Sequence, residues 1–424
     1  MKEKNKIDRR NFLKTVGAAG VGSVIALKQI KADTVEPNKT DPNASGKEQK
    51  TKLPQVPKRK FGKTGVEVPI LSFGAMFDIL ENQIILKKCI EWGITYWDTA
   101  NSYSNGNSEL GIGNFLAKNP QERKKLFIVT KASGAGGKPT HQAVVEAVEE
   151  RLQTSLKRMN TKYVDSYYGI HGLSDPAQLT DELKKWAESA KKRRLIRFFG
   201  FSTHSNMAEC LQAAAKLGWI DAIMLRYNFR YMQDEKMQAA VEACHKKGIA
   251  LIAMKALGKR IKGEPTEEDK KLVKHFMQGG FTDSQAKIRA ALDDEKFCSA
   301  CVTMKTIATL TENASGVLDK TKLTAADMEA LKAYAEATCS GYCAGCANIC
   351  DSALPDVPYV SDIMRYLMYY NSYGDEERAK QLFAWIPGRI RSKLLSADYS
   401  TAEARCPQHI PIGKLMAEAV GKLA

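Results

Sequence analysis

The sequence predicts an α/β protein: an eight-stranded parallel (β/α)8 barrel, or TIM barrel, followed by a small, mainly helical C-terminal domain. Short apolar runs alternate with amphipathic helical patterns over about 250 residues, which is the usual size of such a barrel. The runs are almost continuously apolar, as expected for parallel strands covered by helices. No Gly-x-Gly-x-x-Gly motif follows an early strand, which disfavours an open doubly wound sheet.

The expected elements follow one another in a regular order. A hairpin over 59–68, turning at Lys63-Thr64-Gly65, precedes the first buried strand. The strands are expected at 71–76, 95–100, 126–132, 164–171, 196–202, 222–228, 250–256 and 299–304. Helices are expected at 79–92, 107–117, 140–158, 179–193, 206–217, 234–247 and 266–277. The aromatic-rich stretch 361–395 is expected to form the core of the C-terminal helical domain.

The N-terminus predicts an export signal. Asp8-Arg9-Arg10-Asn11-Phe12-Leu13-Lys14 is a twin-arginine pattern, followed by a mildly apolar run from Thr15 to Leu27. That run is too short and too weak for a comfortable membrane span. Ile30-Lys31-Ala32 is a poor cleavage site, so membrane contact through an uncleaved signal stays open. We expect a periplasmic or other extracytoplasmic location.

The four expected parts are the signal (1–32), a polar disordered spacer (33–55), the barrel (56–320) and a helical domain (321–424). Hydrophobic residues make up 44% and charged residues 26% of the chain, which excludes a disordered chain and a polytopic membrane protein.

The basic character of the chain does not predict a nucleic-acid partner. The net charge is +16, and the eight basic and two acidic residues of the signal account for +6 of it. The densest basic patch elsewhere, Lys191-Lys192-Arg193-Arg194, ends a predicted helix, where cations favour the helix dipole.

Chemically active side chains follow three consecutive strands. Asp98 and then Tyr103 follow the second strand, Lys131 ends the third and His171 ends the fourth. Reactive groups of these barrels lie at the carboxyl ends of the strands, and adjacent strands are about 5 Å apart. We therefore expect these four side chains to converge.

These residues and their surroundings resemble the aldo/keto reductase family over roughly residues 57–318. The resemblance implies that Asp98, Tyr103, Lys131 and His171 form a catalytic tetrad acting on a small carbonyl or alcohol substrate. The matching motifs are Arg59-Lys60-Phe61-Gly62-Lys63-Thr64-Gly65, Phe73-Gly74-Ala75-Met76, Gly93-Ile94-Thr95-Tyr96-Trp97-Asp98-Thr99-Ala100, Asn107-Ser108-Glu109, Gly200-Phe201-Ser202 and Tyr227-Asn228.

The chemistry of carbonyl reduction gives each tetrad residue a role. Hydride must reach carbon and a proton must reach oxygen, yet a phenol with a pKa of about 10 is a weak acid. We expect Lys131 to lower the pKa of Tyr103, the proton donor, and Asp98 to hold Lys131 in place. His171 would orient the substrate carbonyl or share the proton relay.

The resemblance also implies NADP or NAD, bound in an extended form over the barrel mouth. The residues expected to hold it are Gly74, Ser202, Lys255, Lys305, Glu312 and Asn313. Two positions depart from the family: Met254 stands where an aromatic usually stacks on the nicotinamide, and Met224 stands where a Gln is common. The choice between NADP and NAD stays open.

A glycine-rich run after the third strand superficially suggests a phosphate-binding loop. Ala132 and Pro139 stand where that motif needs Gly and Ser or Thr. We interpret Ser133-Gly134-Ala135-Gly136-Gly137-Lys138-Pro139-Thr140 as a flexible substrate loop instead.

A cysteine cluster beyond the barrel predicts a metal centre. Cys343-x2-Cys346-x3-Cys350 and the distant Cys406-Pro407 have the pattern with which ferredoxin-like sequences hold a 4Fe–4S cluster. The region resembles the ferredoxin-type extension of some aldo/keto reductases, with one cluster expected. Structural zinc and disulfides are rival interpretations. Cys339 is an ambiguous fifth residue, because Cys339-x3-Cys343-x2-Cys346 matches the spacing of radical S-adenosylmethionine proteins.

The sequence therefore predicts an exported oxidoreductase that interconverts a carbonyl and an alcohol with a nicotinamide dinucleotide. One 4Fe–4S cluster would couple it to a redox partner protein or a quinone. The alternative is an electron-transfer or binding protein whose barrel has lost reductase activity and whose cysteines bind a structural metal such as zinc.

Overall fold

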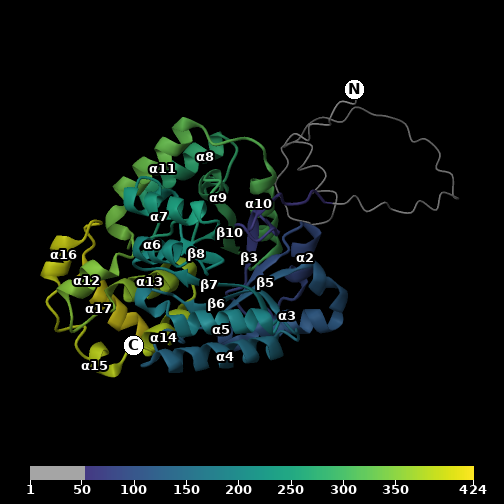
Figure 1. Ribbon diagram of the computed structural model, residues 1–424. Coiled ribbons are helices and arrows are strands. Elements are labelled where there is room, and N and C mark those ends of the chain that lie inside the picture. Colours follow the sequence, from purple (N-terminus) through teal and green to yellow (C-terminus); the bar gives the residue numbers. More distant parts are fainter. Residues whose placement is uncertain (1–52) are drawn as a thin grey trace, which may run out of the picture. The chain divides into compact units, whose positions relative to one another are not determined.

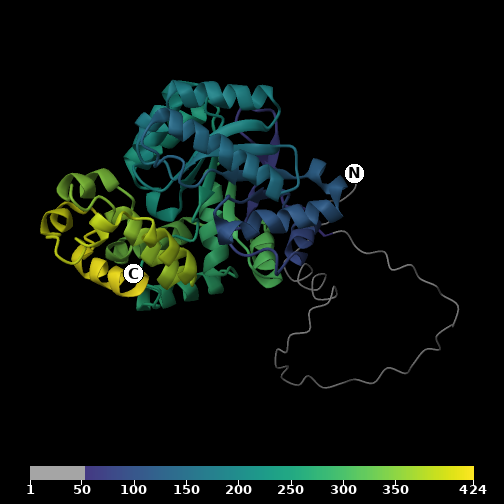
Figure 2. The same cartoon turned by 90° about the horizontal axis from the view of Figure 1, so that it is seen from below.

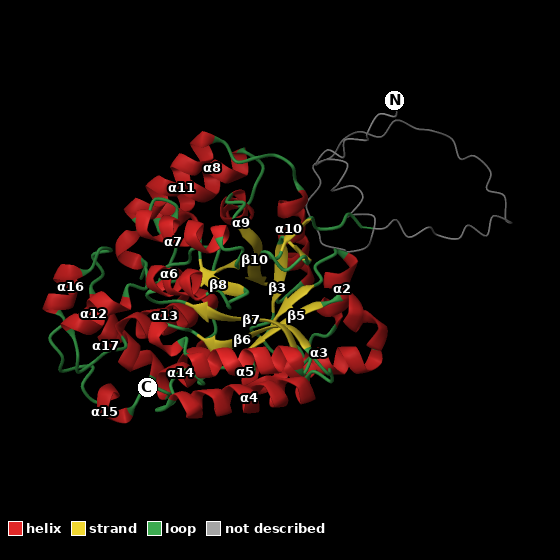
Figure 3. Ribbon diagram, viewed as in Figure 1, coloured by secondary structure: helices red, strands yellow, loops and turns green. Residues whose placement is uncertain are grey.

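The computed structural model describes residues 53–424, so the predicted export signal and most of the spacer lie outside the described residues. Eight parallel strands close into a barrel in the order β10-β3-β4-β5-β6-β7-β8-β9, with helices around them (Figures 1 and 3). The strands are β3 (Leu71–Gly74), β4 (Tyr96–Asp98), β5 (Phe127–Lys131), β6 (Val164–His171), β7 (Ile196–Thr203), β8 (Ala222–Arg226), β9 (Ala250–Met254) and β10 (Phe297–Thr303). This confirms the predicted barrel.

A two-stranded hairpin seals the amino-terminal end of the barrel. It pairs β1 (Lys58–Lys60) with β2 (Glu67–Pro69) in antiparallel register. Phe61 at its turn is fully buried, and its ring lies 4.7 Å from that of Phe127. Gly62 has φ +55°, and a Cβ there would stand 2.3 Å from the Gly248 carbonyl oxygen. Glycine therefore allows the hairpin to lie directly against the barrel.

The helices around the barrel agree with the predicted pattern, with two differences. The predicted helix 79–92 begins only at Ile84, because the Asp78 carboxylate accepts a bond from the Leu80 amide and sets a turn there. Helices over 283–293 and 307–318 lie outside the set of ranges given above. The helices are α2 (Ile84–Glu91), α3 (Asn107–Lys118), α4 (His141–Arg158), α5 (Asp181–Lys192), α6 (Met207–Leu217), α7 (Glu235–Lys246), α8 (Glu267–Gln278), α9 (Asp283–Asp293) and α10 (Ile307–Leu318).

The remaining helices form the C-terminal extension. Its first helix, α11, packs on α8 of the barrel through Leu331 and Tyr334, which join Leu272 and Phe276 in one apolar cluster. The later helices share a separate core that also contains Cys350 and Cys406. The helices of the extension are α11 (Ala325–Ala337), α12 (Ala347–Ala353), α13 (Val360–Tyr373), α14 (Glu376–Ala384), α15 (Gly388–Arg391), α16 (Ser400–Arg405) and α17 (Ile412–Leu423). None of the described helices is long and apolar enough to cross a bilayer.

The C-terminal extension lies against the carboxyl ends of the barrel strands, which form the barrel mouth (Figures 1 and 2). At the end of β8, the buried Arg226 guanidinium donates to the carbonyls of Cys343 and His204. The Asn206 amide donates to the Gly345 carbonyl over 2.8 Å. The cysteine-bearing loop is therefore fixed to the barrel by hydrogen bonds shielded from water.

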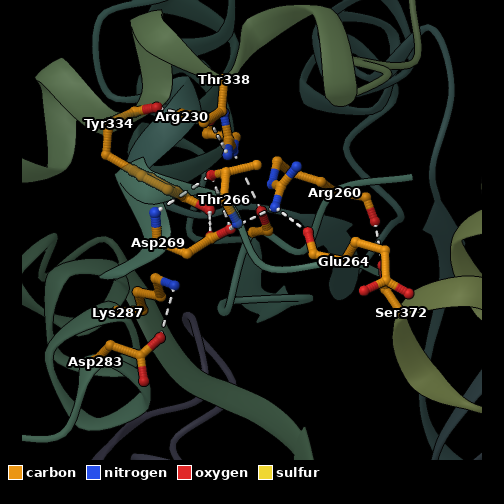
Figure 4. A network of polar contacts seen from close by, with 11 residues as sticks. Arg230, Arg260, Glu264, Thr266, Asp269, Asp283, Lys287, Tyr334, Thr338 and Ser372 are labelled. Carbon is orange, nitrogen blue, oxygen red and sulfur yellow. Dashed lines mark hydrogen bonds and ion pairs between the residues drawn. The ribbon is translucent and has the colours of Figure 1, made fainter. Parts of the chain in front are cut away.

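A second polar network fastens α11 and α13 to the barrel (Figure 4). Asp269 of α8 pairs with Arg260 and accepts a 2.6 Å bond from the Tyr334 hydroxyl. The Ser372 hydroxyl, at the end of α13, donates to the Arg260 carbonyl over 2.5 Å. Arg230 donates to Thr338 over 2.8 Å. The loop that follows β9 is therefore bonded to both helices.

Candidate active site

Four predicted catalytic residues come together at the barrel mouth. Asp98, Lys131 and His171 are the last residues of β4, β5 and β6, which are neighbours in the barrel. Tyr103 begins a tight turn after β4, in which the next three residues, Ser104, Asn105 and Gly106, all have positive φ. The predicted convergence is thus present in the structure.

The Lys131 ammonium organises the centre of the site. It is buried and donates to Asp98 Oδ1 over 2.5 Å, to the Thr99 carbonyl over 2.7 Å and to the Tyr103 hydroxyl oxygen over 3.4 Å. An ammonium has three protons, so these three acceptors use all of them. The Tyr103 hydroxyl accepts from Lys131, and its own proton is left to be given to another group.

Burial outweighs the expected effect of Lys131 on Tyr103. Burial raises the pKa of Tyr103 to about 12, while the nearby Lys131 ammonium lowers it, as expected, without overcoming the increase. Burial alone would lower the pKa of Lys131, but the Asp98 carboxylate overcomes it and the net shift is upward. The site thus holds a protonated phenol beside a fixed cation at neutral pH.

His171 faces the same space as Tyr103. The two rings lie edge-on, with centroids 5.8 Å apart. His171 Nδ1 lies 2.7 Å from the Ser133 hydroxyl oxygen. Burial lowers the pKa of His171 well below its usual value, and Lys131 and Arg378 lower it further. A neutral imidazole and a phenol therefore flank one position at the mouth.

The residues predicted for the nicotinamide end of a dinucleotide are covered by the C-terminal extension. Ser202 is fully buried, and its hydroxyl accepts a 3.1 Å bond from the Gly172 amide. Lys255 has φ +57°, and its ammonium donates to the Tyr369 hydroxyl of α13 over 2.9 Å. Farther along, Lys259 donates to the Ser372 carbonyl over 2.8 Å. Helix α13 therefore contacts Lys255, one of the residues expected at the nicotinamide end, and Lys259 beyond it.

The other predicted cofactor residues differ in their exposure and contacts. A Cβ on Gly74 would lie 3.1 Å from the backbone of Val302 and Thr303, so close strand contact already requires this glycine. Glu312 accepts a 2.7 Å bond from the Thr282 hydroxyl, and Asn313 is buried. Lys305 is exposed. Of the six predicted cofactor residues, Lys305 is the one exposed cation.

Helix α13, at the barrel mouth, also brings charged side chains to the site. Burial would raise the pKa of Tyr369, but Lys255 and Arg365 lower it to about 7. The cations Lys131, Arg378, Arg365 and Lys255 all lower the pKa of His171. The mouth therefore favours negatively charged groups.

The four predicted cluster ligands line a single small cavity. Cys343, Cys346, Cys350 and Cys406 share its wall with the apolar residues Val360, Met364, Ile410 and Ile412, while Cys339 is not among the lining residues. Burial and the neighbouring thiols raise the pKa values of Cys346 and Cys350. All ten cysteines are free, so no disulfide is formed. No group of three or more His, Cys, Asp or Glu residues within 53–424 is arranged to hold a single metal ion.

Five residues near the tetrad were not predicted as parts of the site: Ser102, Ser133, Arg365, Tyr369 and Arg378. Ser133 opens the predicted substrate loop, and its position directly after Lys131 was a usable signal. Tyr369 belongs to the aromatic stretch expected to form a core. The chain separates Arg378 from Ser102 by 276 positions, so no local pattern indicates their contact.

Comparison with known proteins agrees with this geometry. The profile of the aldo/keto reductase family matches residues 75–334. The chain belongs to the aldo/keto reductase family. It is 28% identical to the aldo-keto reductase yakc [NADP(+)] of Schizosaccharomyces pombe, over 48% of this chain and 62% of that protein. It is 31% identical to an aldo-keto reductase of Gibberella moniliformis, over 38% of this chain and 51% of that protein.

Solved structures show the same fold. The holo form of an aldo-keto reductase from Bacillus halodurans matches with a TM-score of 0.53 and 22% identity, over 66% of this chain and 96% of that one. A thermostable aldo-keto reductase bound to epalrestat matches with a TM-score of 0.52 and 24% identity, over 66% of this chain and 100% of that one. The chain spans only 62% of the length of the Schizosaccharomyces pombe relative and 51% of that of the Gibberella moniliformis relative.

A dinucleotide-binding measurement tests the covered nicotinamide end. We expect no saturable change in NADPH or NADH fluorescence when the full chain is added, because Lys255, a residue expected at the nicotinamide end, is bonded to Tyr369 of α13. Tyr369→Ala should open this position and increase binding, whereas Tyr370→Ala, the matched control on the same helix, should not. Tight binding to the unaltered chain that Tyr369→Ala leaves unchanged would contradict the covered site.

Proposed function

We propose that the chain is an exported oxidoreductase that interconverts a small carbonyl compound and its alcohol at the Asp98, Tyr103, Lys131 and His171 tetrad. A 4Fe–4S cluster in the C-terminal extension would couple this site to a redox partner protein or a quinone. The observation that carries the catalytic part is the bonding of Lys131, which leaves the Tyr103 proton free beside a neutral His171.

The side chains divide the proton chemistry between them. A carbonyl oxygen placed between the Tyr103 hydroxyl and the His171 ring receives hydrogen bonds from both. As negative charge grows on that oxygen, Tyr103 transfers its hydroxyl proton to it. Lys131, held by Asp98 and the Thr99 carbonyl, stabilises the phenolate that remains. In alcohol oxidation the same phenolate accepts the proton.

Carbonyl reduction also needs a donor of two electrons, which is a different group from the proton donor. The family resemblance favours NAD or NADP, and the printed name of the yeast relative includes NADP(+). In this chain Ser202, expected at the nicotinamide end, is buried, and Lys255, expected there too, is bonded to Tyr369 of α13. The proton chemistry of the tetrad is the same whichever donor supplies the electrons.

The donor set in the extension suits an iron–sulfur cluster. Cys343, Cys346, Cys350 and Cys406 would hold it, and apolar walls would shield it from solvent. When bound, the cluster would supply one-electron transfer. Thiols that line a cavity without converging on one point fit a four-iron body better than a single zinc ion. Arg226 and Ser361 tie this cysteine loop to the ends of β8 and β7.

Export fits the same proposal. The Arg9-Arg10 pattern lies outside the described residues, and its support is the order of the sequence motif alone. The twin-arginine route characteristically carries folded proteins, often with a cofactor inserted beforehand. A chain whose cluster-bearing extension is fixed to its barrel would need to fold and receive the cluster before export.

Replacement of the phenol tests the tetrad. We expect Tyr103→Phe to lower kcat about 10²–10⁴-fold, because the proton donor is lost. Turnover would be measured on a panel of small aldehydes and ketones, with NADPH, NADH and a reduced viologen dye as electron donors. Tyr96→Phe is the matched control, since it removes a buried hydroxyl that lies 3.4 Å from that of Tyr168. Full turnover by Tyr103→Phe would rule out the mechanism.

Metal analysis tests the extension. Protein purified without oxygen should contain about four irons per chain and absorb broadly in the visible range. Cys406→Ala should lose both properties, while Cys298→Ala, which removes a buried barrel cysteine, should keep them. Stoichiometric zinc without iron would instead support the structural-metal alternative.

A further inference from the structure

A hydrogen-bonded chain connects His171 to the C-terminal extension. Arg378 of α14 donates from Nη2 to the Ser102 hydroxyl oxygen over 3.1 Å. The Ser102 and Ser133 hydroxyl oxygens lie 2.7 Å apart, and Ser133 Oγ lies 2.7 Å from His171 Nδ1. Ser133 and Arg378 are almost fully buried. Three hydrogen bonds therefore join the charged end of Arg378 to one nitrogen of the catalytic imidazole.

The guanidinium fixes the direction of the first bond, because it has donors and no acceptor and Ser102 must accept from it. A serine oxygen can accept two bonds, so the next direction depends on where the single Ser102 proton goes. Among the described residues, the Ser133 hydroxyl oxygen is the one hydrogen-bond partner of the Ser102 hydroxyl besides Arg378. Ser102 therefore donates to Ser133, and Ser133 donates to His171 Nδ1. A nitrogen that accepts a hydrogen bond carries no proton in the neutral ring, so the imidazole proton lies on Nε2.

We propose that Arg378 is a positioning residue that fixes His171 in the neutral tautomer with its proton on Nε2, acting through Ser102 and Ser133. In this form the ring donates from Nε2 to the substrate carbonyl, in addition to the bond from Tyr103. The role of the donated bond rests on the proposed function, whereas the tautomer itself does not.

The same helix also holds the turn that carries Tyr103. Gln381 of α14 donates to the Asn105 side-chain carbonyl over 2.7 Å, and Asn105 donates to Glu377 over 3.4 Å. Asn105 has φ +53°, a conformation that costs free energy unless surrounding contacts maintain it. Helix α14 therefore positions both groups that would face the carbonyl, and an undocked extension would leave the barrel without an ordered pair.

Charge and hydrogen bonding can be separated by substitution. Arg378→Met removes both the cation and the donor, whereas Arg378→Gln keeps an N–H donor and removes the charge. The charged groups that face His171 from other elements are Lys131 on β5, Lys255 after β9 and Arg365 on α13. These remain in both variants, so each comparison isolates Arg378.

The test is nuclear magnetic resonance of the full, cluster-loaded chain labelled at its six histidines, with His171→Gln used to assign the signal. We expect the His171 ring of the unaltered chain to carry its proton on Nε2. Arg378→Met and Ser133→Ala should give a mixture of tautomers, and Arg378→Gln should restore the Nε2 form. Lys380→Met, an exposed position on the same helix, should change nothing.

Turnover supplies the second readout. Arg378→Met should lower kcat at least about tenfold with little change in KM, and Arg378→Gln should recover most of it. A His171 proton on Nδ1 in the unaltered chain, or an unchanged tautomer in Arg378→Met, would overturn the inference. Because the tautomer is measured without substrate, absence of turnover on every carbonyl tested would count against the proposed function and leave this result unaffected.

Discussion

The contact between the Lys255 ammonium and the Tyr369 hydroxyl, 2.9 Å apart, joins the end of β9 to helix α13. The left-handed backbone of Lys255 aims its side chain at α13, where it also lies over the Tyr369 ring. With this contact in place, the C-terminal extension becomes one wall of the active site.

Docking of the extension on the barrel mouth brings several cationic side chains together in a buried space. The cations at the mouth are Lys131, Lys255, Arg365 and Arg378. Lys131 is paired with Asp98, and Arg365 is paired with Asp362. Burial, reinforced by these cations, lowers the pKa of His171, and Lys255 and Arg365 lower the pKa of Tyr369. The arrangement favours a substrate oxygen on which negative charge develops during the reaction. Arg226, at the end of β8, holds the cysteine loop beside the same strand ends by donating to the Cys343 carbonyl.

The sequence predicted the parts of the molecule that depend on local pattern. The eight strands follow from apolar runs, and Asp98, Lys131 and His171 follow from their places at strand ends. The net pKa of Tyr103 could not be predicted, because burial in the folded chain outweighs the effect of the adjacent Lys131. The pairing of Arg378 with Ser102 and of Tyr369 with Lys255 depends on docking between distant segments. The start of α2 was misplaced because an Asp78 turn replaces one helical turn.

Titration of Tyr369 tests the closed mouth most directly. Ultraviolet difference absorption of the folded chain should show one tyrosine that ionises with a midpoint near pH 7, the value to which Lys255 and Arg365 lower its pKa. Tyr369→Phe should remove that step, and Lys255→Met should move it to higher pH because a stabilising cation is lost. If no tyrosine ionises below about pH 9, and Tyr369→Phe titrates like the unaltered chain, α13 does not cover the barrel as described.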